Sequence, residues 1–375
     1  MSILFGGDIF FNEKKVPIIS HDFLTKAIKE SEFFSVNLEG PVFGDANKGI
    51  DKVGPLKFQS KNTLDFLKSA GVNKVCLANN HIMDAGMLGL VSTIDLLDKT
   101  SISFFGLEDR SGGSDKKIAR VEVEGKSLSI IGVAEEEFNS PLIFGRGAFI
   151  IDEIEIWRVV KQEIDSGREV VVVFHGGVEH EILPPPWLRR LGHWLIDLGA
   201  RAVITHHCHV PGHVEVYKGC PIAWSLGNFW FSNFNGEFKN NSGYVVELSF
   251  QNDNFLNWKI IPYYSDYQAE EIREMRDDEL LKWQDHVAFF DKVMNSEKLY
   301  NDWWNSFFEK KKNGYIYKYS LSPFPRSVSK WVIKILRKCK NEYWKIRQLN
   351  GLRCRSHREI WTQALLKSYF DEKND

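Results

Sequence analysis

The chain has 375 residues and a formal net charge of −2, and its composition is that of an ordinary soluble globular protein. This near-neutral balance excludes the strongly basic and strongly acidic classes, so the charge of the whole chain favours no particular partner. The five cysteines form no CxxC pair and no disulfide framework, which indicates a reducing compartment. The sequence has no apolar run of about 18 residues and therefore predicts no membrane span.

Two strands near the N-terminus each lead into a carboxylate. The pattern predicts a strand at Ser2–Phe5 that ends on Gly-Gly-Asp8, a short helix at His21–Lys29, and a strand at Phe33–Leu38 that ends on Glu39. A carboxylate at the end of a strand is either a local turn cap or a ligand. Because the same arrangement occurs twice, the ligand interpretation is favoured.

A third polar group follows the next predicted strand. A helix at Ser60–Ala70, with Ser60 as its N-cap, precedes a strand at Val72–Ala78 that runs into Asn79-Asn80-His81. Asparagine also caps helices and histidine also occurs in cores, so either residue alone has a structural explanation. The position of the group at a strand end, before an amphipathic helix at Leu88–Leu97, indicates a site instead.

The middle of the chain alternates strands and helices. We expect a hairpin over Val121–Val133 and a helix over Asp152–Ser166. A buried strand at Glu169–Phe174 then leads directly to His175, and a helix follows at Trp187–Leu198 after a run of prolines. In an open α/β sheet, ligands bind at the carboxyl ends of the strands, so His175 lies where a site is expected.

A second group of histidines follows the strand Ala202–Thr205. Residues two apart on a strand point the same way, so we expect His207 and His209 to face one crevice while Cys208 faces away. Neutral imidazoles are favoured ligands of zinc, manganese or iron, whereas magnesium and calcium prefer oxygen ligands. The alternative is an ordinary solvated loop, but the strand-end position favours a metal site.

The remaining strands complete an α/β domain. A hairpin is expected around Lys218-Gly219, a further polar strand end at Asn228, and two strands at Tyr244–Phe250 and Phe255–Ile261. Alternating strands and helices indicate an α/β fold.

Six motifs carry a resemblance to a known family. They occur in order along the chain as GGD at 6–8, VNLEGP at 36–41, LANNHIMDAG at 77–86, HGGVE at 175–179, THHCHV at 205–210 and SLGNF at 225–229. In this order and spacing the chain resembles the bacterial capsule-synthesis (CapA, poly-γ-glutamate capsule) protein family, within the calcineurin-like metallophosphoesterase fold. The resemblance covers about residues 1–262.

The resemblance implies a four-layer α-β-β-α sandwich of two mixed sheets with two divalent metal ions of the manganese, zinc or iron type. It implies that Asp8 and His209 bind one ion and that Glu39 bridges the two. The second ion has a ligand set made of Asn80, His175 and His207. The same resemblance gives His81 the catalytic role of stabilising the transition state or protonating the leaving group.

The chain departs from the family pattern at several positions. The metallophosphoesterase pattern has a histidine two residues after the first aspartate, and this chain has Phe10 there, so one ion has fewer protein ligands. The capsule family itself commonly lacks that histidine. Asp84, Glu179 and Asn228 match family positions, and we expect them to contact the substrate or to support the ligands.

The region beyond residue 264 lies outside the resemblance. We expect one domain over residues 1–264 and a mainly helical, aromatic-rich region over 265–375. Residues 326–358 are basic, with apolar residues on one helical face between 328 and 336. Such a segment either contacts an anionic membrane surface or polymer, or packs on the first domain with its lysines in water.

Two functions are consistent with these observations. One is a metal-dependent hydrolase, most plausibly of a phosphoester bond, in the synthesis of a capsule, a surface polysaccharide or a polyanionic polymer. The other is a non-catalytic component that binds such a polymer during assembly. The expected partner is an anionic polymer, or a phosphorylated small molecule or glycan, and no motif predicts nucleic-acid binding. Because the first strand begins at residue 2, we expect a cytoplasmic protein, with a peripheral membrane contact through residues 326–358 as an alternative.

Overall fold

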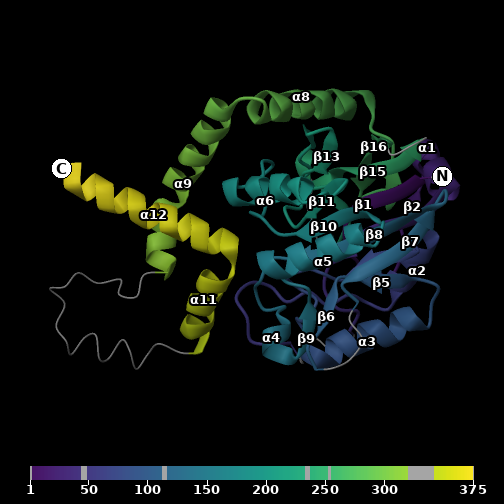
Figure 1. Ribbon diagram of the computed structural model, residues 1–375, viewed down its shortest axis with the longest axis horizontal. Helices are drawn as coiled ribbons and strands as arrows, with labels where there is room; N and C mark the ends of the chain where they lie inside the picture. The colour runs from purple at the N-terminus through teal and green to yellow at the C-terminus, as the bar shows by residue number, and fades with distance from the viewer. Residues whose placement is uncertain are drawn as a thin grey trace.

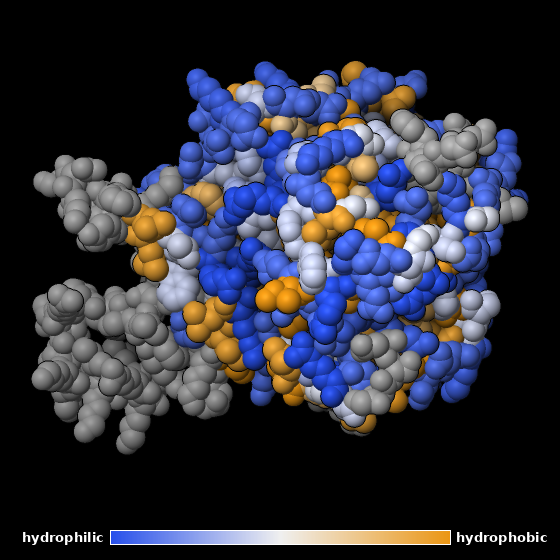
Figure 2. Space-filling view, in the orientation of Figure 1, coloured by the Kyte–Doolittle hydropathy of each residue, from blue (hydrophilic) through white to orange (hydrophobic). Residues whose placement is uncertain are grey.

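Two mixed β-sheets form the centre of the molecule, and helices lie around them (Figure 1). The computed structural model describes residues 2–43, 49–111, 116–232, 237–251, 255–319 and 342–374. Among the described residues no helix is both long and apolar enough to cross a bilayer. Figure 2 shows that hydrophilic side chains predominate on the face seen in Figure 1, with hydrophobic ones in small groups.

The first sheet has the order β2-β17-β16-β15-β1-β3-β4-β5, and β14 also pairs with β1. The central strand β1 runs parallel to β3 and β14 and antiparallel to β15. The strands of this sheet are β1 (Ser2–Phe10), β2 (Ile18–Ile19), β3 (Ser31–Leu38), β4 (Lys74–Cys76), β5 (Ser103–Phe105), β14 (Asn228–Phe231), β15 (Ser242–Gln251), β16 (Phe255–Asp266) and β17 (Glu271–Arg273).

The second sheet has the order β12-β13-β11-β10-β8-β7. Its inner strands β8, β10 and β11 are parallel, and β7 and β12 are antiparallel strands at its edges. Its strands are β7 (Ile118–Val123), β8 (Lys126–Ala134), β10 (Glu169–His175), β11 (Ala202–His206), β12 (Val214–Tyr217) and β13 (Cys220–Ala223), and β6 (Leu107–Asp109) pairs separately with β9 (Arg146–Ala148).

The helices belong to three groups: those that follow the first sheet's strands, those that follow the second sheet's strands, and those of the C-terminal region. Their bounds are α1 (Asp22–Glu30), α2 (Asn62–Ser69), α3 (Gly86–Asp98), α4 (Pro141–Phe144), α5 (Glu153–Asp165), α6 (Pro186–Asp197), α7 (Phe238–Asn241), α8 (Asp277–Met294), α9 (Glu297–Tyr319), α11 (Glu342–Arg353) and α12 (Arg355–Asn374).

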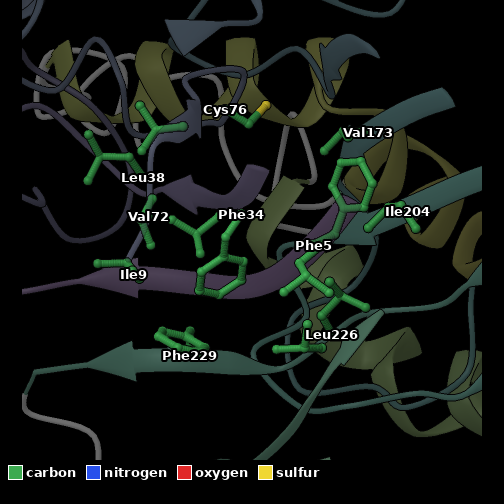
Figure 3. Close-up of a cluster of buried hydrophobic side chains, with 14 of the residues drawn as sticks. Phe5, Ile9, Phe34, Leu38, Val72, Cys76, Val173, Ile204, Leu226 and Phe229 are labelled. Atoms are coloured by element: carbon green, nitrogen blue, oxygen red, sulfur yellow. The ribbon is translucent and has the colours of Figure 1, made fainter. Parts of the chain in front are cut away.

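Strand β10 shows why the molecule is layered. Its valines alternate: Val171 and Val173 belong to the core that contains Phe5 and Phe34 of the first sheet, whereas Val172 belongs to a second core formed with α5 and α6. Figure 3 shows Val173 and Ile204 beside Phe5 in the space between the sheets. Since successive side chains of a strand point to opposite faces, each sheet is covered on both sides. The predicted four-layer α-β-β-α sandwich is therefore confirmed.

The first strand is longer than the sequence suggested. We expected it to end before Gly-Gly-Asp, but β1 continues to Phe10 and includes Asp8. Gly7 allows two backbone segments to approach closely, because a Cβ at this position would lie 2.1 Å from the carbonyl oxygen of Gly227. The amide of Asp8 donates a hydrogen bond of 3.0 Å to that same oxygen. Tertiary pairing thus overrides the local turn signal.

The start of α2 also differs from the prediction. Ser60 is not its N-cap, because the helix begins at Asn62 after Lys61, which has helical backbone angles and makes no side-chain cap. Asn228, expected at a strand end, is instead the first residue of β14, and β16 continues to Asp266, beyond the predicted Ile261. The other predicted boundaries agree within about three residues. In particular, Asp152 caps α5 by accepting hydrogen bonds of 3.0 Å from the amides of Ile154 and Glu155.

The C-terminal helices share the second core. Phe290 of α8 and Trp304 of α9 are buried in the same cluster as Trp187 of α6. The predicted basic segment 326–358 lies in part outside the described residues, since 320–341 are not described. In its described part, Arg353 lies 3.8 Å from Glu136 and Arg355 pairs with Glu153. The division at residue 264 stays a prediction.

Glu215 of β12 connects α6 to the second sheet. Its carboxylate accepts hydrogen bonds from Arg189 at 2.9 Å, His193 at 3.0 Å and the indole of Trp224 at 2.9 Å. Burial opposes its ionisation, but the hydrogen bonds from His193 and Arg189 lower its pKa below the usual 4.5. The ionised form therefore stabilises the fold.

We expect Glu215→Gln to lower the free energy of unfolding by about 2 kcal/mol at pH 7, because it weakens charge-assisted hydrogen bonds. The folded-state pKa is lowered, so this stabilisation is present above pH 4.5 and is lost as the pH falls through the lowered pKa. Urea unfolding of both proteins from pH 7 to pH 3 measures the difference. A difference that stays constant over this range would contradict the assignment.

Candidate metal centre

Carboxylate and imidazole groups from three strands meet at one buried point. Asp8 of β1, Glu39 directly after β3 and His175 at the end of β10 each offer a ligand atom, and these atoms lie within 4.8 Å of one another. All three residues are buried. Two of the strands belong to the first sheet and one to the second, so the sandwich itself brings these side chains together.

A second set of ligand atoms lies around His175. Its Nε2 is 3.1 Å from the Oδ1 of Asn80 and 3.2 Å from the Nδ1 of His207. Ligand atoms in tetrahedral positions about 2.1 Å from one ion lie about 3.4 Å apart. These two distances are therefore compatible with a common metal ion.

His209 lies beside the two carboxylates. Its Nδ1 is 3.5 Å from Asp8 Oδ2, and its Nε2 is 3.5 Å from Glu39 Oε1. The Oδ1 of Asn228 accepts from the same Nδ1 at 2.9 Å. The structure thus brings the six residues predicted as ligands close to one another, and it places Asn228 as a partner of His209. His175 lies near Asp8 and Glu39 as well as near Asn80 and His207, so the division into two ligand sets stays a prediction.

The two histidines reach the site by a route that strand geometry did not predict. Strand β11 ends at His206, and the next residues form a turn in which His207 has φ 96° and His209 has φ 61°. The expected strand alternation is therefore wrong, although both imidazoles do face the site. Positive φ values in residues other than glycine cost about 1–3 kcal/mol each and cluster at functional sites.

Two further residues contact Asp8, and the sequence did not single them out as site residues. The Nδ1 of His206 lies 3.1 Å from Asp8 Oδ1, and the Nδ2 of Asn37 donates to the same oxygen at 2.8 Å. Burial opposes the ionisation of Asp8, but the interaction with His206 lowers its pKa below the usual 3.8. His206 could have been found, because it is the first residue after the predicted strand.

Glu39 is the residue whose surroundings test the fit of a metal. Its side chain is fully buried, and neither oxygen has a hydrogen-bond partner among the described residues. Burial, followed by the charge of Asp8, raises its pKa well above the usual 4.5. A buried carboxylate without partners is costly unless a cation neutralises it. The donor set of carboxylates, imidazoles and one amide therefore fits divalent metal binding.

Asn80 is oriented by a glutamate that sequence reasoning missed. Its Nδ2 donates to Glu137 Oε1 at 3.0 Å, which turns the amide oxygen toward His175. Burial raises the pKa of Glu137. Three consecutive glutamates, at 135–137, directly follow β8. They could have been found in the sequence, because a polar group after an apolar strand also indicated the other site residues.

His81 is held by a buried ion pair. Its Nδ1 lies 2.7 Å from Asp84 Oδ2, and Lys52 donates to Asp84 Oδ1 at 2.7 Å. Burial and the charge of Lys52 lower the pKa of His81 to about 4. Because a carboxylate only accepts, the proton of the neutral ring is on Nδ1, and Nε2 faces Glu39 Oε1 at 3.8 Å. Lys52 lies in a segment to which the sequence gave no role.

We expect Lys52→Met to destabilise the protein by about 3–5 kcal/mol, because it leaves the carboxylate of Asp84 buried without its cation. The double variant Lys52→Met/Asp84→Asn is expected to recover part of this loss. Urea unfolding at pH 7 gives both values, with the exposed Lys99→Met as control. A loss below about 1 kcal/mol would show that the pair is not needed for folding.

The other residues of interest lie at the edge of the site. Burial opposes the ionisation of Glu179, but His207 and His209 lower its pKa to about 2, and its side chain lines the adjacent cavity. Phe10 packs against Phe231 with ring centroids 5.3 Å apart, and the Lys57 ammonium lies over both rings. Position 10 is thus filled by a buried aromatic ring where the wider pattern has a ligand.

Comparison with known proteins places these residues in a described family. The chain is 28% identical over 248 residues to the PGA biosynthesis protein CapA of Bacillus subtilis (strain 168), which covers 62% of this chain and 63% of that protein. It is 27% identical over 212 residues to the capsule biosynthesis protein CapA of Bacillus anthracis, which covers 54% of this chain and 51% of that protein. The chain thus spans between half and two thirds of the length of these relatives.

The chain also aligns with the solved structure of a putative 5'-nucleotidase from Staphylococcus aureus in complex with alpha-ketoglutarate. The alignment covers 78% of this chain and 59% of the nucleotidase chain, with a TM-score of 0.48 and 15% identity. The family model described as bacterial capsule synthesis protein PGA_cap matches residues 2–233, which include every residue of the candidate metal centre. The chain therefore belongs to the bacterial capsule synthesis protein PGA_cap family.

Proposed function

We propose that the protein is a metal-dependent hydrolase, of the phosphoester type, that acts in the synthesis of a capsule or another polyanionic polymer. The observation that carries this proposal is the buried meeting of Asp8, Glu39 and His175, in which both oxygens of Glu39 have no hydrogen-bond partner among the described residues. The names of the relatives, which concern capsule and PGA biosynthesis, support the biological setting.

In this proposal two divalent ions occupy the site. Asp8 and His209 hold one ion, and Asn80, His175 and His207 hold the other. Glu39, next to His209, lies between the two groups. When bound, such ions act as Lewis acids and make a water nucleophilic near neutral pH.

His81 is the residue that we assign to the reacting group. It is buried beside Glu39, and its Nδ1 is fixed by Asp84. In the neutral ring the nitrogen that faces the site carries a lone pair, so His81 would first accept a proton there and only then could protonate a leaving group, the role that the resemblance implied. Lys52 keeps Asp84 ionised, and this ionised partner fixes the tautomer of His81.

The test combines metal counting with turnover. Elemental analysis of the purified chain is expected to find bound manganese, zinc or iron, and a generic phosphodiester with added manganese is expected to turn over. His81→Ala should lower the turnover rate by about 100-fold or more while the metal content stays unchanged. A chain that binds no metal would exclude the proposal.

A second function is favoured by the aromatic side chain at position 10. Phe10 supplies no ligand, and its ring is covered by Phe231 and Lys57. A centre with this reduced ligand set suits an assembly component that binds an anionic polymer without cleaving it. Metal-dependent binding of poly-γ-glutamate, with no turnover of phosphoesters or of the polymer itself, would favour this function over the first.

A further inference from the structure

The cavity beside the candidate metal centre has a second wall that comes from the C-terminal helices. The cavity has a volume of about 350 Å³. One wall includes Asn80, His81 and His207, and the other includes Phe307, Tyr315 and His357. The helices that supply the second wall begin after residue 295, outside the family match, and Figure 1 shows them grouped at one end of the molecule.

A single buried carboxylate fixes this second wall to the first. Glu135, at the end of β8, accepts hydrogen bonds from the amide of Gly177 at 3.0 Å, from the hydroxyl of Ser356 at 3.0 Å and from the thiol of Cys354 at 3.2 Å. It also accepts from the amide of Ser356 at the N-terminus of α12. Since the helix N-terminus favours a negative charge, these contacts fix α12 beside the loop that follows His175.

The wall continues away from the metal centre into a second cavity of about 660 Å³. The two cavities share His180, Phe307 and Lys311 as lining residues, so they adjoin along α9. The second cavity adds Lys310 and Lys239, of which Lys239 also lies 3.2 Å from Glu237, against the single carboxylate of Glu181 among its described lining residues. Its charge is therefore complementary to an anion.

One side of α9 runs past both cavities. Trp303, Phe307, Lys311 and Tyr315 follow each other at intervals of four residues and line one or both cavities. At 1.5 Å per residue this side of the helix is about 18 Å long. A small phosphorylated molecule would fill only the part next to the metal centre, whereas an extended chain would follow the whole length.

We propose that this side of α9, together with Lys239 and Lys310, is a binding track for the part of an anionic polymer that extends beyond the metal centre. The inference rests on the proposed function for the identity of the group at the metal ions. The lysines hold the anionic groups of the chain, and Trp303 and Tyr315 contact its methylene segments. The hydroxyl of Tyr315 also forms a hydrogen bond of 3.0 Å with the Nδ1 of His357, which connects α9 to α12.

The test uses the full chain loaded with manganese and two probes, poly-γ-glutamate and polyphosphate, each as a dimer and as a chain of about ten units. The variant is Lys239→Gln/Lys310→Gln, two exposed lysines that line only the second cavity, and the control is Lys292→Gln/Lys298→Gln, exposed lysines of α8 and α9. We expect the variant to weaken binding of the ten-unit poly-γ-glutamate about tenfold at low salt, and to leave its dimer and the metal content unchanged. Polyphosphate has no methylene segments for Trp303 and Tyr315 to contact, so a loss confined to polyphosphate would overturn the track.

The outcomes separate this inference from the proposed function. A tenfold loss for the long probe, in a protein that turns over no phosphodiester, would support the track and exclude the hydrolase. Phosphodiester turnover with equal probe binding by variant and wild type would overturn the track and leave the hydrolase. The track is also overturned if dimer and long probe lose affinity equally, if the control behaves like the variant, or if neither probe binds more tightly as it lengthens.

Discussion

Asp8→Asn is expected to lower metal affinity by at least about 100-fold, because it removes a metal ligand and not only a residue that supports a ligand. Turnover should fall with the metal content. Asp8 lies at the centre of the site. It accepts hydrogen bonds from Asn37 at 2.8 Å and from the amide of His207 at 3.1 Å, and His206 and His209 lie within 3.5 Å. Elemental analysis after dialysis against a weak chelator measures the loss.

The same substitution should also destabilise the metal-free protein. The pKa of Asp8 is lowered by its partners, so its ionised form stabilises the folded state at pH 7. We expect a loss of about 1–3 kcal/mol on replacing it, because hydrogen bonds to a charged group are weakened. The exposed Asp98→Asn on α3 is the control, and metal content equal to that of wild type in Asp8→Asn would show that Asp8 is no ligand.

Glu39→Gln is expected to remove metal binding to a similar extent but to stabilise the metal-free protein. Its carboxylate is buried with no hydrogen-bond partner among the described residues, and Asp8 repels its charge. Removing that charge should raise the free energy of unfolding in the presence of a chelator by about 1 kcal/mol or more, because a buried carboxylate without a hydrogen-bond partner destabilises the fold. The carboxylate that would hold a cation thus lowers the free energy of unfolding of the metal-free protein.

The pH dependence of stability is a second test of the direction of the Glu39→Gln effect. The pKa of Glu39 is raised in the folded state, so its effect on stability is small below pH 4.5 and becomes unfavourable as the pH rises through the raised pKa. The difference between Glu39→Gln and wild type should therefore increase from pH 4.5 to pH 8. The exposed Glu32→Gln on β3 should show no such trend. A variant less stable than wild type throughout would contradict the assignment.

The sequence indicated the residues of the candidate site because most of them follow apolar strands. Asp8, Glu39, His175 and the His206–His209 segment stand next to apolar runs, and apolar runs are read from local pattern alone. The prediction erred where packing decided the local conformation. Strand β1 passes through Gly7 because the Gly227 carbonyl lies against it, and His207 and His209 face the site from a turn with positive φ.

Other parts of the site gave no local signal. Lys52 belongs to a segment without regular structure, and its buried contact with Asp84 bridges 32 positions of the chain. Glu135 holds Ser356, 221 residues away, and nothing near either residue indicates the pairing. The contribution of α9 and α12 to the cavity was likewise absent from the motifs, which end before residue 262.

By itself the sequence determined the α/β class, the approximate positions of most strands and the family, since these depend on local periodicity and on the chemistry of single side chains. Only the tertiary structure decided which carboxylate is left without partners, which lysine neutralises Asp84, and which helices close the cavity. Those features arise from contacts between segments far apart in the chain, and such contacts depend on how the two sheets and the C-terminal helices pack, which no local pattern encodes.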